Sequence, residues 1–470
     1  MSNVETFANI VGAQACLTER DEVAPYASDW RGAYEAQPVA VIKPGSTAEV
    51  AGVMQAAAAA QLAVVPAGGR TGLCGGAVAQ SNGPASIVLS MERMNRIRSI
   101  DARDFSIVAD AGCIIQNVQE AAAKADRLFP IQWGAQGTAQ VGGMLGTNAG
   151  GIRTLRWGNA RELVLGLEVV LADGRVLDDL RRVRKDNSGY ALRHLFIGAE
   201  GTLGVITAAA MRLAPALKRV ETAFVAVASP DAALSLYGRM MESGAELIAF
   251  ELCNRYTMTT AKHYGVGLQM PLELESPWYV MVEIAAAHAS VPLREMMEDT
   301  LGAALEVGEI TDAAIAESEA QRLGIWKIRE DYPECFRLAG PAASTDTSVP
   351  VSAVPEFLDR AITATEKRWP EGRIAAIGHA GDGNIHFSLQ VPEGWDEERT
   401  DWVVRTDGFE AMVNEIAVSL GGSFSAEHGI GQSKRHAMAT HKNSVAVGMM
   451  RDLKAVLDPD GRMNPGKVLP

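Results

Sequence analysis

Hydrophobic positions in the first half of the chain fall into short runs separated by alanine-rich stretches. Between residues 38 and 215, β-branched runs such as Val39–Ile42 and Leu62–Val65 alternate with stretches of small residues, which predicts strands alternating with helices. Ser46 and Glu49 have the spacing of a capping box. We therefore predict that a helix begins at Ser46.

After residue 218 the spacing becomes that of longer strands and amphipathic helices, which is typical of an α+β domain. Just before this region, a glycine-containing turn at 172–174 separates two strand-like runs and predicts a hairpin. The predicted strands are 165–171, 175–177, 220–227 and 278–284, and the predicted helices are 231–243, 294–305, 311–323 and 354–368.

One segment near the C-terminal end alternates strictly. Its odd-numbered residues from 385 to 391 are apolar, and the residues between them are polar. This alternation predicts a half-buried strand with His386 on its polar face. His379 precedes the strand in a glycine-rich stretch, so we expect it to come from a loop beside His386.

Metal-binding side chains gather in two glycine-rich stretches. His379 and His386 share the first, and Glu427 and His428 share the second. Two imidazoles and a carboxylate form the ligand set of an open divalent-metal site, so we predict a metal on His379, His386 and Glu427. His428 adjoins Glu427 and is better suited as a general base. Scattered histidines are often surface or core residues, but their clustering favours a site.

Glycine-rich loops occur at three places, 66–76, 134–151 and 198–207, and the first directly follows a predicted strand. Glycines let successive backbone N–H groups approach and bind an anion. The loops match neither the nucleoside-triphosphatase nor the dinucleotide pattern. One such loop could equally be a turn, but three favour an extended phosphate-bearing cofactor.

Composition narrows the class of partner. A chain of 470 residues, 47% hydrophobic and 21% charged, is typical of a globular protein with more than one domain. Its net charge of -14 argues against nucleic acid and anionic membranes as partners. No apolar run is long enough for a membrane span. Five dispersed cysteines are typical of free thiols in a reducing cytoplasm, where we expect the protein to act.

The glycine loops, the segment 185–190 and the terminal run 464–467 resemble a known family. The loops resemble the FAD-binding domain of flavoproteins of the vanillyl-alcohol oxidase type. The histidine stretches and the terminal run resemble its D-2-hydroxy-acid dehydrogenase branch. Within that branch, residues 134–143 together with 147–151 most resemble D-2-hydroxyglutarate dehydrogenases. The resemblance implies an α+β fold, with a two-subdomain FAD-binding domain and an α+β substrate domain containing an antiparallel sheet. We accordingly expect an FAD-binding domain at 1–215, a substrate domain with the metal site at 216–435, and a segment at 436–470 that returns to the FAD-binding domain.

The resemblance implies non-covalent FAD. Members that attach the flavin use a histidine in the first loop or a cysteine in the second, where this chain has Arg70–Thr71 and Thr138–Ala139. The implied cofactor-binding residues are Pro66, Ala67, Gly68, Gly69, Arg70, Thr71, Gly72, Leu73, Gly137, Thr138, Gly142, Gly143, Thr147, Asn148, Gly151, Glu200, Gly201, Gly204, Val205, Ile206 and Asn464.

The resemblance also implies the reaction. A D-2-hydroxy acid is oxidised to the 2-oxo acid by hydride transfer to flavin N5, while a divalent metal chelates the substrate and His428 removes the hydroxyl proton. Zinc is the first expectation, with manganese or iron as alternatives. Arg329 is implied to bind the substrate carboxylate, and Asn384 to contact substrate or hold the loop. Without the resemblance, Arg329 would be interpreted as a solvated helix charge paired with Glu330.

The sequence departs from the hydroxyglutarate-specific pattern at two positions. Those members have a lysine where this chain has Ser344 and a threonine where it has Pro333. D-lactate-like and larger D-2-hydroxy acids therefore stay open as substrates. The electron acceptor could be a flavoprotein, a quinone or a cytochrome, and homodimers are common among such enzymes. The alternatives are an oxygen-using flavin oxidase and a non-enzymatic regulator that binds flavin or metal.

Overall fold

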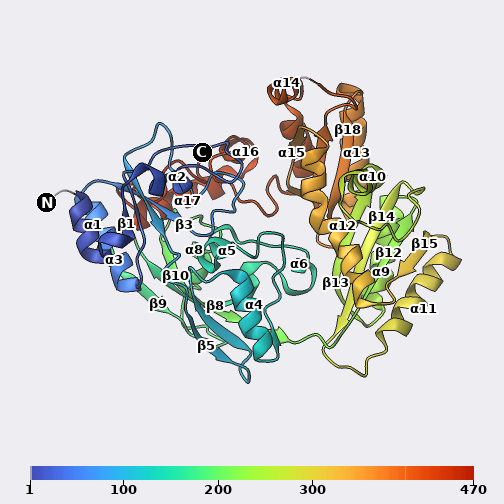
Figure 1. Cartoon of the computed structure of the whole chain (residues 1–470), viewed down its shortest axis with the longest axis horizontal. Helices are drawn as coiled ribbons and strands as arrows, with labels where there is room; N and C mark the ends of the chain where they lie inside the picture. The colour runs from blue at the N-terminus through green and yellow to red at the C-terminus, as the bar shows by residue number, and fades with distance from the viewer. Residues whose placement is uncertain (1–2, 397) are drawn as a thin grey trace. The chain divides into compact units, whose positions relative to one another are not determined.

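The computed structural model describes residues 3–396 and 398–470, and the chain folds into two compact units (Figure 1). The sequence predicts domain boundaries after residues 215 and 435. In the structure, the chain leaves the first unit after Ala216 and returns to it after Ala426. The first unit consists of Met1–Gly151, Trp157–Ala216 and Glu427–Pro470, and the second of Ile152–Arg156 and Leu217–Ala426.

Two sheets build the first unit. In the smaller sheet, β4 runs parallel to both β2 and β3, and β1 pairs antiparallel with β2. The larger sheet is antiparallel, in the order β5-β6-β10-β8-β9. The strands are β1 (Cys16–Leu17), β2 (Ala40–Ile42), β3 (Ala63–Ala67), β4 (Ser86–Ser90), β5 (Ile97–Asp101), β6 (Ser106–Asp110), β8 (Val164–Val170), β9 (Val176–Asp179) and β10 (Val205–Arg212), with β7 (Arg127–Leu128) and β11 (Ala214–Pro215) pairing separately.

The helices of this unit connect strands or follow the glycine loops. The predicted helix start is confirmed, because the Ser46 hydroxyl accepts a hydrogen bond from the Glu49 amide at 3.2 Å. The helices are α1 (Asn3–Val11), α2 (Arg20–Ala27), α3 (Thr47–Ala59), α4 (Ile115–Lys124), α5 (Val141–Thr147), α7 (Ala160–Leu163), α8 (Arg193–Phe196), α16 (Arg435–His441) and α17 (Ser444–Leu457), while α6 (Thr154–Trp157) spans the unit boundary.

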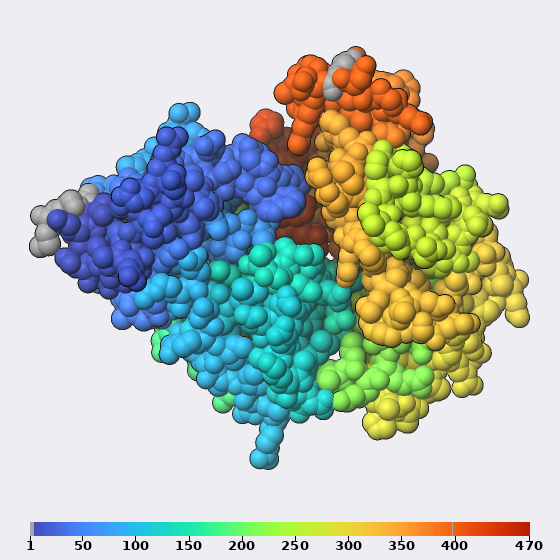
Figure 2. Space-filling model, viewed as in Figure 1, coloured from blue at the N-terminus to red at the C-terminus, as the bar shows by residue number. Residues whose placement is uncertain are grey.

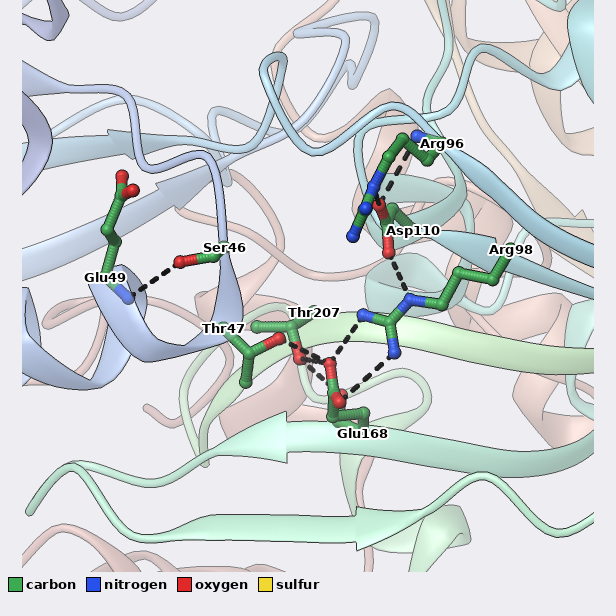
Figure 3. A network of polar contacts seen from close by, with 8 residues as sticks. All are labelled: Ser46, Thr47, Glu49, Arg96, Arg98, Asp110, Glu168 and Thr207. Carbon is green, nitrogen blue, oxygen red and sulfur yellow. Dashed lines mark hydrogen bonds and ion pairs between the residues drawn. The ribbon is translucent and has the colours of Figure 1, made fainter.

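A network of buried charges ties the larger sheet to α3. Arg98 on β5 lies between Asp110 on β6 and Glu168 on β8 (Figure 3). Its guanidinium donates to Asp110 at 2.5 Å and to Glu168 at 2.9 Å. Glu168 also accepts hydrogen bonds from the hydroxyls of Thr47 and Thr207, at 2.6 and 2.8 Å. Burial alone would raise the pKa of Glu168, but Arg98 and the two hydroxyls lower it overall.

The second unit is built on one antiparallel sheet in the order β15-β12-β14-β13-β18-β19-β16, with β17 also pairing with β19. One face packs against α9, α11, α13 and α15. The opposite face packs against α10 and α12, and α10 with the residues after it forms part of the surface (Figure 2). The elements are β12 (Arg219–Val227), α9 (Pro230–Glu242), β13 (Glu246–Asn254), α10 (Arg255–Tyr264), β14 (Trp278–Ala286), α11 (Leu293–Glu306), β15 (Ile310–Ile315), α12 (Glu319–Leu338), β16 (Ala342–Ser344), β17 (Thr347–Ser348), α13 (Val354–Arg368), β18 (Arg373–His379), β19 (Asn384–Gln390), α14 (Arg399–Arg405) and α15 (Phe409–Ser419).

The prediction of a helix at 311–323 is wrong. Residues Ile310–Ile315 form β15, which pairs antiparallel with β12 at the sheet edge, and α12 begins only at Glu319. The alanines at 313, 314 and 316 suggested a helix, but pairing with β12 outweighs that local preference. The predicted hairpin is present as β8 and β9, and the other predicted strands and helices after residue 218 are present within a few residues.

Two further predictions concern membrane-spanning helices and the state of the cysteines. Among the helices of residues 3–396 and 398–470, none has both the length and the apolar character that crossing a bilayer requires. All five cysteines are buried free thiols.

The Arg98 network leads to a stability prediction. Arg98→Met removes the cation between two buried carboxylates, leaving Glu168 with only hydroxyl partners, and should destabilise the protein by about 3–5 kcal/mol at neutral pH. Because Arg98 lowers the folded-state pKa of Glu168, its contribution is present above the unfolded-state pKa and is lost as pH falls through the folded-state value. Urea unfolding at neutral and acidic pH should therefore give a difference between wild type and variant that shrinks with acidification.

Arg96 provides the matched control, because it contacts the same Asp110 carboxylate from an exposed position. Arg96→Met should cost no more than about 1 kcal/mol. Equal costs for the two variants would contradict the assignment of the buried network to Arg98.

Candidate active site

Both histidines of the first glycine-rich stretch lie on one β-hairpin. His379 is the last residue of β18 and not a loop residue as predicted, while His386 lies in β19 as predicted. Ile377 pairs with His386 in the ladder, so His379, two residues further along the strand, projects from the same face. The two rings lie 5.9 Å apart, centroid to centroid. Gly383 closes the turn at φ +84°, and a Cβ there would lie 1.9 Å from a backbone oxygen of Val349.

Glu251 joins His379 to Arg329. It lies on β13 opposite His379, and its side chain is 0% exposed. One carboxylate oxygen hydrogen-bonds Nδ1 of His379, and the other accepts from Nε of Arg329 at 2.8 Å. Burial alone would raise the pKa of Glu251, but His379 and Arg329 outweigh it and hold the pKa at about 2. Because an ionised carboxylate only accepts, Nδ1 of His379 carries a proton, so Nε2 is the ring nitrogen that could bind a metal.

Arg329 comes from the sheet-facing side of α12. It follows the buried Trp326 by nearly one turn and precedes the buried Tyr332 by the same spacing, so it shares their face. Pro333 lies inside the same helix. The interpretation of Arg329 as a solvated charge paired with Glu330 is not supported, because the guanidinium bonds Glu251 and Glu330 is exposed.

Asp346 and Asn384 lie beside His386. Nδ1 of His386 is 4.0 Å from the Asp346 carboxylate. The amide of Asn384 donates to Asp346 at 3.3 Å and to the Thr347 carbonyl at 2.9 Å, so Asn384 holds the adjoining strand. Its own Oδ1 is buried and has no hydrogen-bond partner in the described part of the chain. The side chain therefore retains acceptor capacity for a ligand.

Glu427 and His428 directly follow a residue anchored to Asp346. The amide of Ala426 donates to the Asp346 carbonyl at 3.1 Å. Because Glu427 and His428 come next in the chain, this bond fixes the backbone from which their side chains start. His379, His386 and Glu427 each offer a ligand atom within 4.8 Å of the others. Asp346, Glu427 and His428 form a second such group. The first group has the donors of a divalent-metal site, so the residues fit the predicted metal.

In the first unit, the first two glycine loops touch through their backbones. A Cβ on Gly69 would lie 2.1 Å from the carbonyl oxygen of Thr138, and one on Gly68 would lie 3.2 Å from the backbone of Gly143. Glycine is therefore required for this approach. The remaining residues of these loops that are predicted to bind the cofactor lie at the end of β3 (Pro66, Ala67), in the first two loops (Thr71, Gly72, Leu73, Gly137), on and after α5 (Gly142, Thr147, Asn148, Gly151), before β10 (Gly201, Gly204) and at its start (Val205, Ile206).

Two side chains predicted to bind the cofactor already have structural partners. Arg70 stacks on the Tyr26 ring, 4.1 Å from its centroid. Glu200 accepts hydrogen bonds from the amides of Ile430 and Gly431, at 2.7 and 2.8 Å. Burial raises the pKa of this carboxyl group. Glu200 therefore anchors the segment after His428, a role that the sequence did not indicate.

Asn464 lies where these loops meet. Its amide donates to the carbonyls of Gly76 and Glu200, at 2.9 and 2.7 Å. Within the described residues, the buried Oδ1 of Asn464 and Oε1 of Gln140 have no hydrogen-bond partner. Because buried acceptors are nearly always bonded, they indicate a ligand that supplies donors, and the hydroxyl and N–H groups of FAD fit this requirement.

Sequence reasoning missed Glu251 and gave Asp346 no role. Glu251 could have been noticed as a charged residue inside the otherwise apolar run 247–253. A carboxylate at such a position must be paired, but its partners are distant in the sequence. Asp346 carries no comparable signal.

Comparisons with known proteins agree with this description. The family of FAD linked oxidases, C-terminal domain, matches residues 216–468, and an FAD binding domain family matches residues 38–179. The chain is 35% identical over 459 residues to D-2-hydroxyglutarate dehydrogenase of Xanthomonas citri pv. viticola, covering 97% of this chain and 95% of that protein. It is 33% identical over 489 residues to a putative mitochondrial D-lactate dehydrogenase of Schizosaccharomyces pombe, covering 99% and 89%.

Solved structures show the same fold. An alkyldihydroxyacetonephosphate synthase superposes with a TM-score of 0.75 at 15% identity, covering 98% of this chain and 85% of that one. The fold and the two matched domains define an FAD-linked oxidoreductase. With its full-length relatives, the chain belongs to the family of FAD-linked D-2-hydroxy-acid dehydrogenases of the vanillyl-alcohol oxidase type.

The loop contact predicts the effect of one methyl group. Gly69→Ala must push the second loop away from the first and should cost about 1–3 kcal/mol in the FAD-binding conformation. The purified variant should bind FAD roughly tenfold or more weakly, measured by titrating the apoprotein and following flavin fluorescence. Gly134→Ala, where a Cβ meets open space, is the control and should keep wild-type affinity. Full FAD affinity in Gly69→Ala would refute the role of this contact.

Proposed function

We propose that this enzyme carries out the metal-assisted oxidation of a D-2-hydroxy acid, first of all D-2-hydroxyglutarate, to the corresponding 2-oxo acid. The observation that carries the proposal is the group His379, His386 and Glu427, whose ligand atoms lie within 4.8 Å of one another. Arg329, bonded to Glu251 beside His379, adds a cation of the kind that binds carboxylates. The names of the full-length relatives support hydroxyglutarate as the first substrate.

Zinc is the metal that we propose. Two imidazoles and one carboxylate leave coordination positions for a substrate, as in catalytic zinc sites. The same donors suit manganese or iron. When bound, FAD would supply the hydride acceptor at N5 and the metal would supply Lewis-acid polarisation of the substrate hydroxyl.

The chain's own residues would orient the substrate and move one proton. Arg329 would bind the C1 carboxylate through its terminal amino groups, because its Nε donates to Glu251. His428 would take the hydroxyl proton on a ring nitrogen, a general-base role for which imidazole is well suited. Asn384 would offer its Oδ1 to a substrate donor while its amide nitrogen holds Thr347. Non-covalent FAD and an external electron acceptor complete the proposal.

The proposal predicts anaerobic bleaching of the flavin absorbance by D-2-hydroxyglutarate and not by its L-enantiomer. Removal of the metal with a chelator should abolish bleaching, because the substrate hydroxyl would no longer be chelated or polarised. Added zinc or manganese should restore bleaching. Stopped-flow absorbance at the flavin band measures both effects. Bleaching that is indifferent to chelation would refute the metal-assisted reaction.

A base variant separates proton removal from metal binding. His428→Asn should retain FAD and metal but slow bleaching by about 10²–10⁴-fold. His436→Asn is the control, because His436 lies on α16 and belongs to neither metal-type group, and this variant should bleach at the wild-type rate.

Ser344 favours a second candidate, a D-2-hydroxy acid without a distal carboxylate, such as D-lactate. The name of the Schizosaccharomyces pombe relative, a putative D-lactate dehydrogenase, supports this candidate. Ser344 is exposed on β16 and its hydroxyl bonds that of Ser388 at 2.9 Å, so no cation stands at this position. Ser344→Lys should lower the KM for D-2-hydroxyglutarate by about 10-fold, since a hydrogen bond to a charged group contributes about 1.5–3 kcal/mol, and leave the KM for D-lactate unchanged. Steady-state kinetics with both acids, with Ser344→Met as the uncharged control, decides between them.

A further inference from the structure

Glu251 occupies an unusual place for a carboxylate. The α10 and α12 face of the sheet is lined by apolar side chains such as Cys253, Met281 and Ile377. Glu251 has the same strand parity as Cys253 and therefore points into this face, and it is 0% exposed. A charge at such depth persists only when it is paired and hydrogen-bonded.

Its two oxygens have different partners with different tasks. One holds Nδ1 of His379 and the other holds Nε of Arg329. The first bond fixes the ring of His379 so that Nε2 faces away from the carboxylate, as in carboxylate–histidine–metal arrangements. The second fixes the guanidinium plane of Arg329, whose orientation decides whether a carboxylate is bound in the fork geometry.

We propose that Glu251 is a positioning residue that sets the metal-binding nitrogen of His379 and the carboxylate-binding edge of Arg329 at the same time. This inference rests on the proposed function, because it assigns those two tasks to His379 and Arg329. It predicts that a change at Glu251 alters metal affinity and substrate affinity together, and that removing another buried carboxylate from the same sheet face alters neither.

The isosteric amide cannot replace this carboxylate. The oxygen of a glutamine side chain can accept from His379 or from Arg329, and its nitrogen then faces the other donor. If the nitrogen faces His379, the ring must accept at Nδ1 and carry its proton on Nε2, where the metal would bind. If it faces Arg329, two donors oppose each other and the guanidinium must turn away.

Glu283 provides a matched control on the same face. It lies on β14, is 3% exposed, and bonds Thr222, Trp326 and Arg322 at 2.6, 2.5 and 3.1 Å. It shares no hydrogen-bond partner with Glu251. Glu283→Gln therefore removes an equally buried charge, with a similar risk to stability, from a place that touches neither His379 nor Arg329.

The test compares zinc dissociation constants of the FAD-loaded proteins by competition with a coloured chelator, together with the KM for D-2-hydroxyglutarate. Glu251→Gln should weaken zinc binding by about 10–100-fold and raise the KM. Glu283→Gln should leave both values within about twofold of wild type. Thermal unfolding and FAD content report on the fold of each variant. Glu251→Asp keeps the charge but cannot span both partners, so it should fold and still bind zinc more weakly.

The outcomes separate the two levels of the proposal. Wild-type zinc affinity in a folded Glu251→Gln or Glu251→Asp protein overturns the positioning role. Equal losses in Glu251→Gln and Glu283→Gln also overturn it, because they would show a general effect of buried charge. If wild type and His386→Ala bind zinc with the same affinity, the metal site itself fails, and with it the proposed function.

Discussion

A carboxylate buried in an apolar sheet face must be fully paired, and the organisation of the second unit meets this requirement for Glu251. Its strand lies between β14 and β18 near the middle of the sheet, so His379 on β18 can reach it from the side. The helix α12 crosses the same face and brings Arg329 from above. The hairpin of β18 and β19 then adds His386 to that face. The same pairing that makes the buried charge tolerable brings the residues of the candidate site together.

The first unit satisfies a different constraint, the close approach of backbones. Its loops offer few side chains to a cofactor, because Arg70 and Glu200 are already engaged with their own unit. What remains is glycine backbone, together with the unpartnered acceptors of Gln140 and Asn464 within the described residues. Behind the loops, Arg98 couples strands of the larger sheet through charge. Cofactor binding in this unit therefore depends on backbone geometry more than on side-chain chemistry.

Much of this could be predicted from local pattern. The capping box at Ser46, the hairpin after Leu165 and the alternation around His386 are properties of adjacent residues, and each is present. The strand at 310–315 was not predicted, because its structure depends on edge pairing with β12. The place of Glu251 in the candidate site was not predicted for the same reason. Its partners are distant in the sequence, and only the sheet register brings His379 beside it. The residues that we propose as metal ligands could be picked out because they are clustered in two short stretches.

Pro333 inside α12 affects how Arg329 is held. In an α-helix the amide of residue 333 would donate to the carbonyl of residue 329, but proline has no N–H, so this turn lacks that bond. The helix backbone therefore lacks one hydrogen bond at the residue that carries the guanidinium, while the guanidinium itself is held at Nε by Glu251. Small bending motions of α12 can then be absorbed along the flexible stem of the arginine. The position of the Arg329 charge therefore depends on Glu251 more than on the motion of α12.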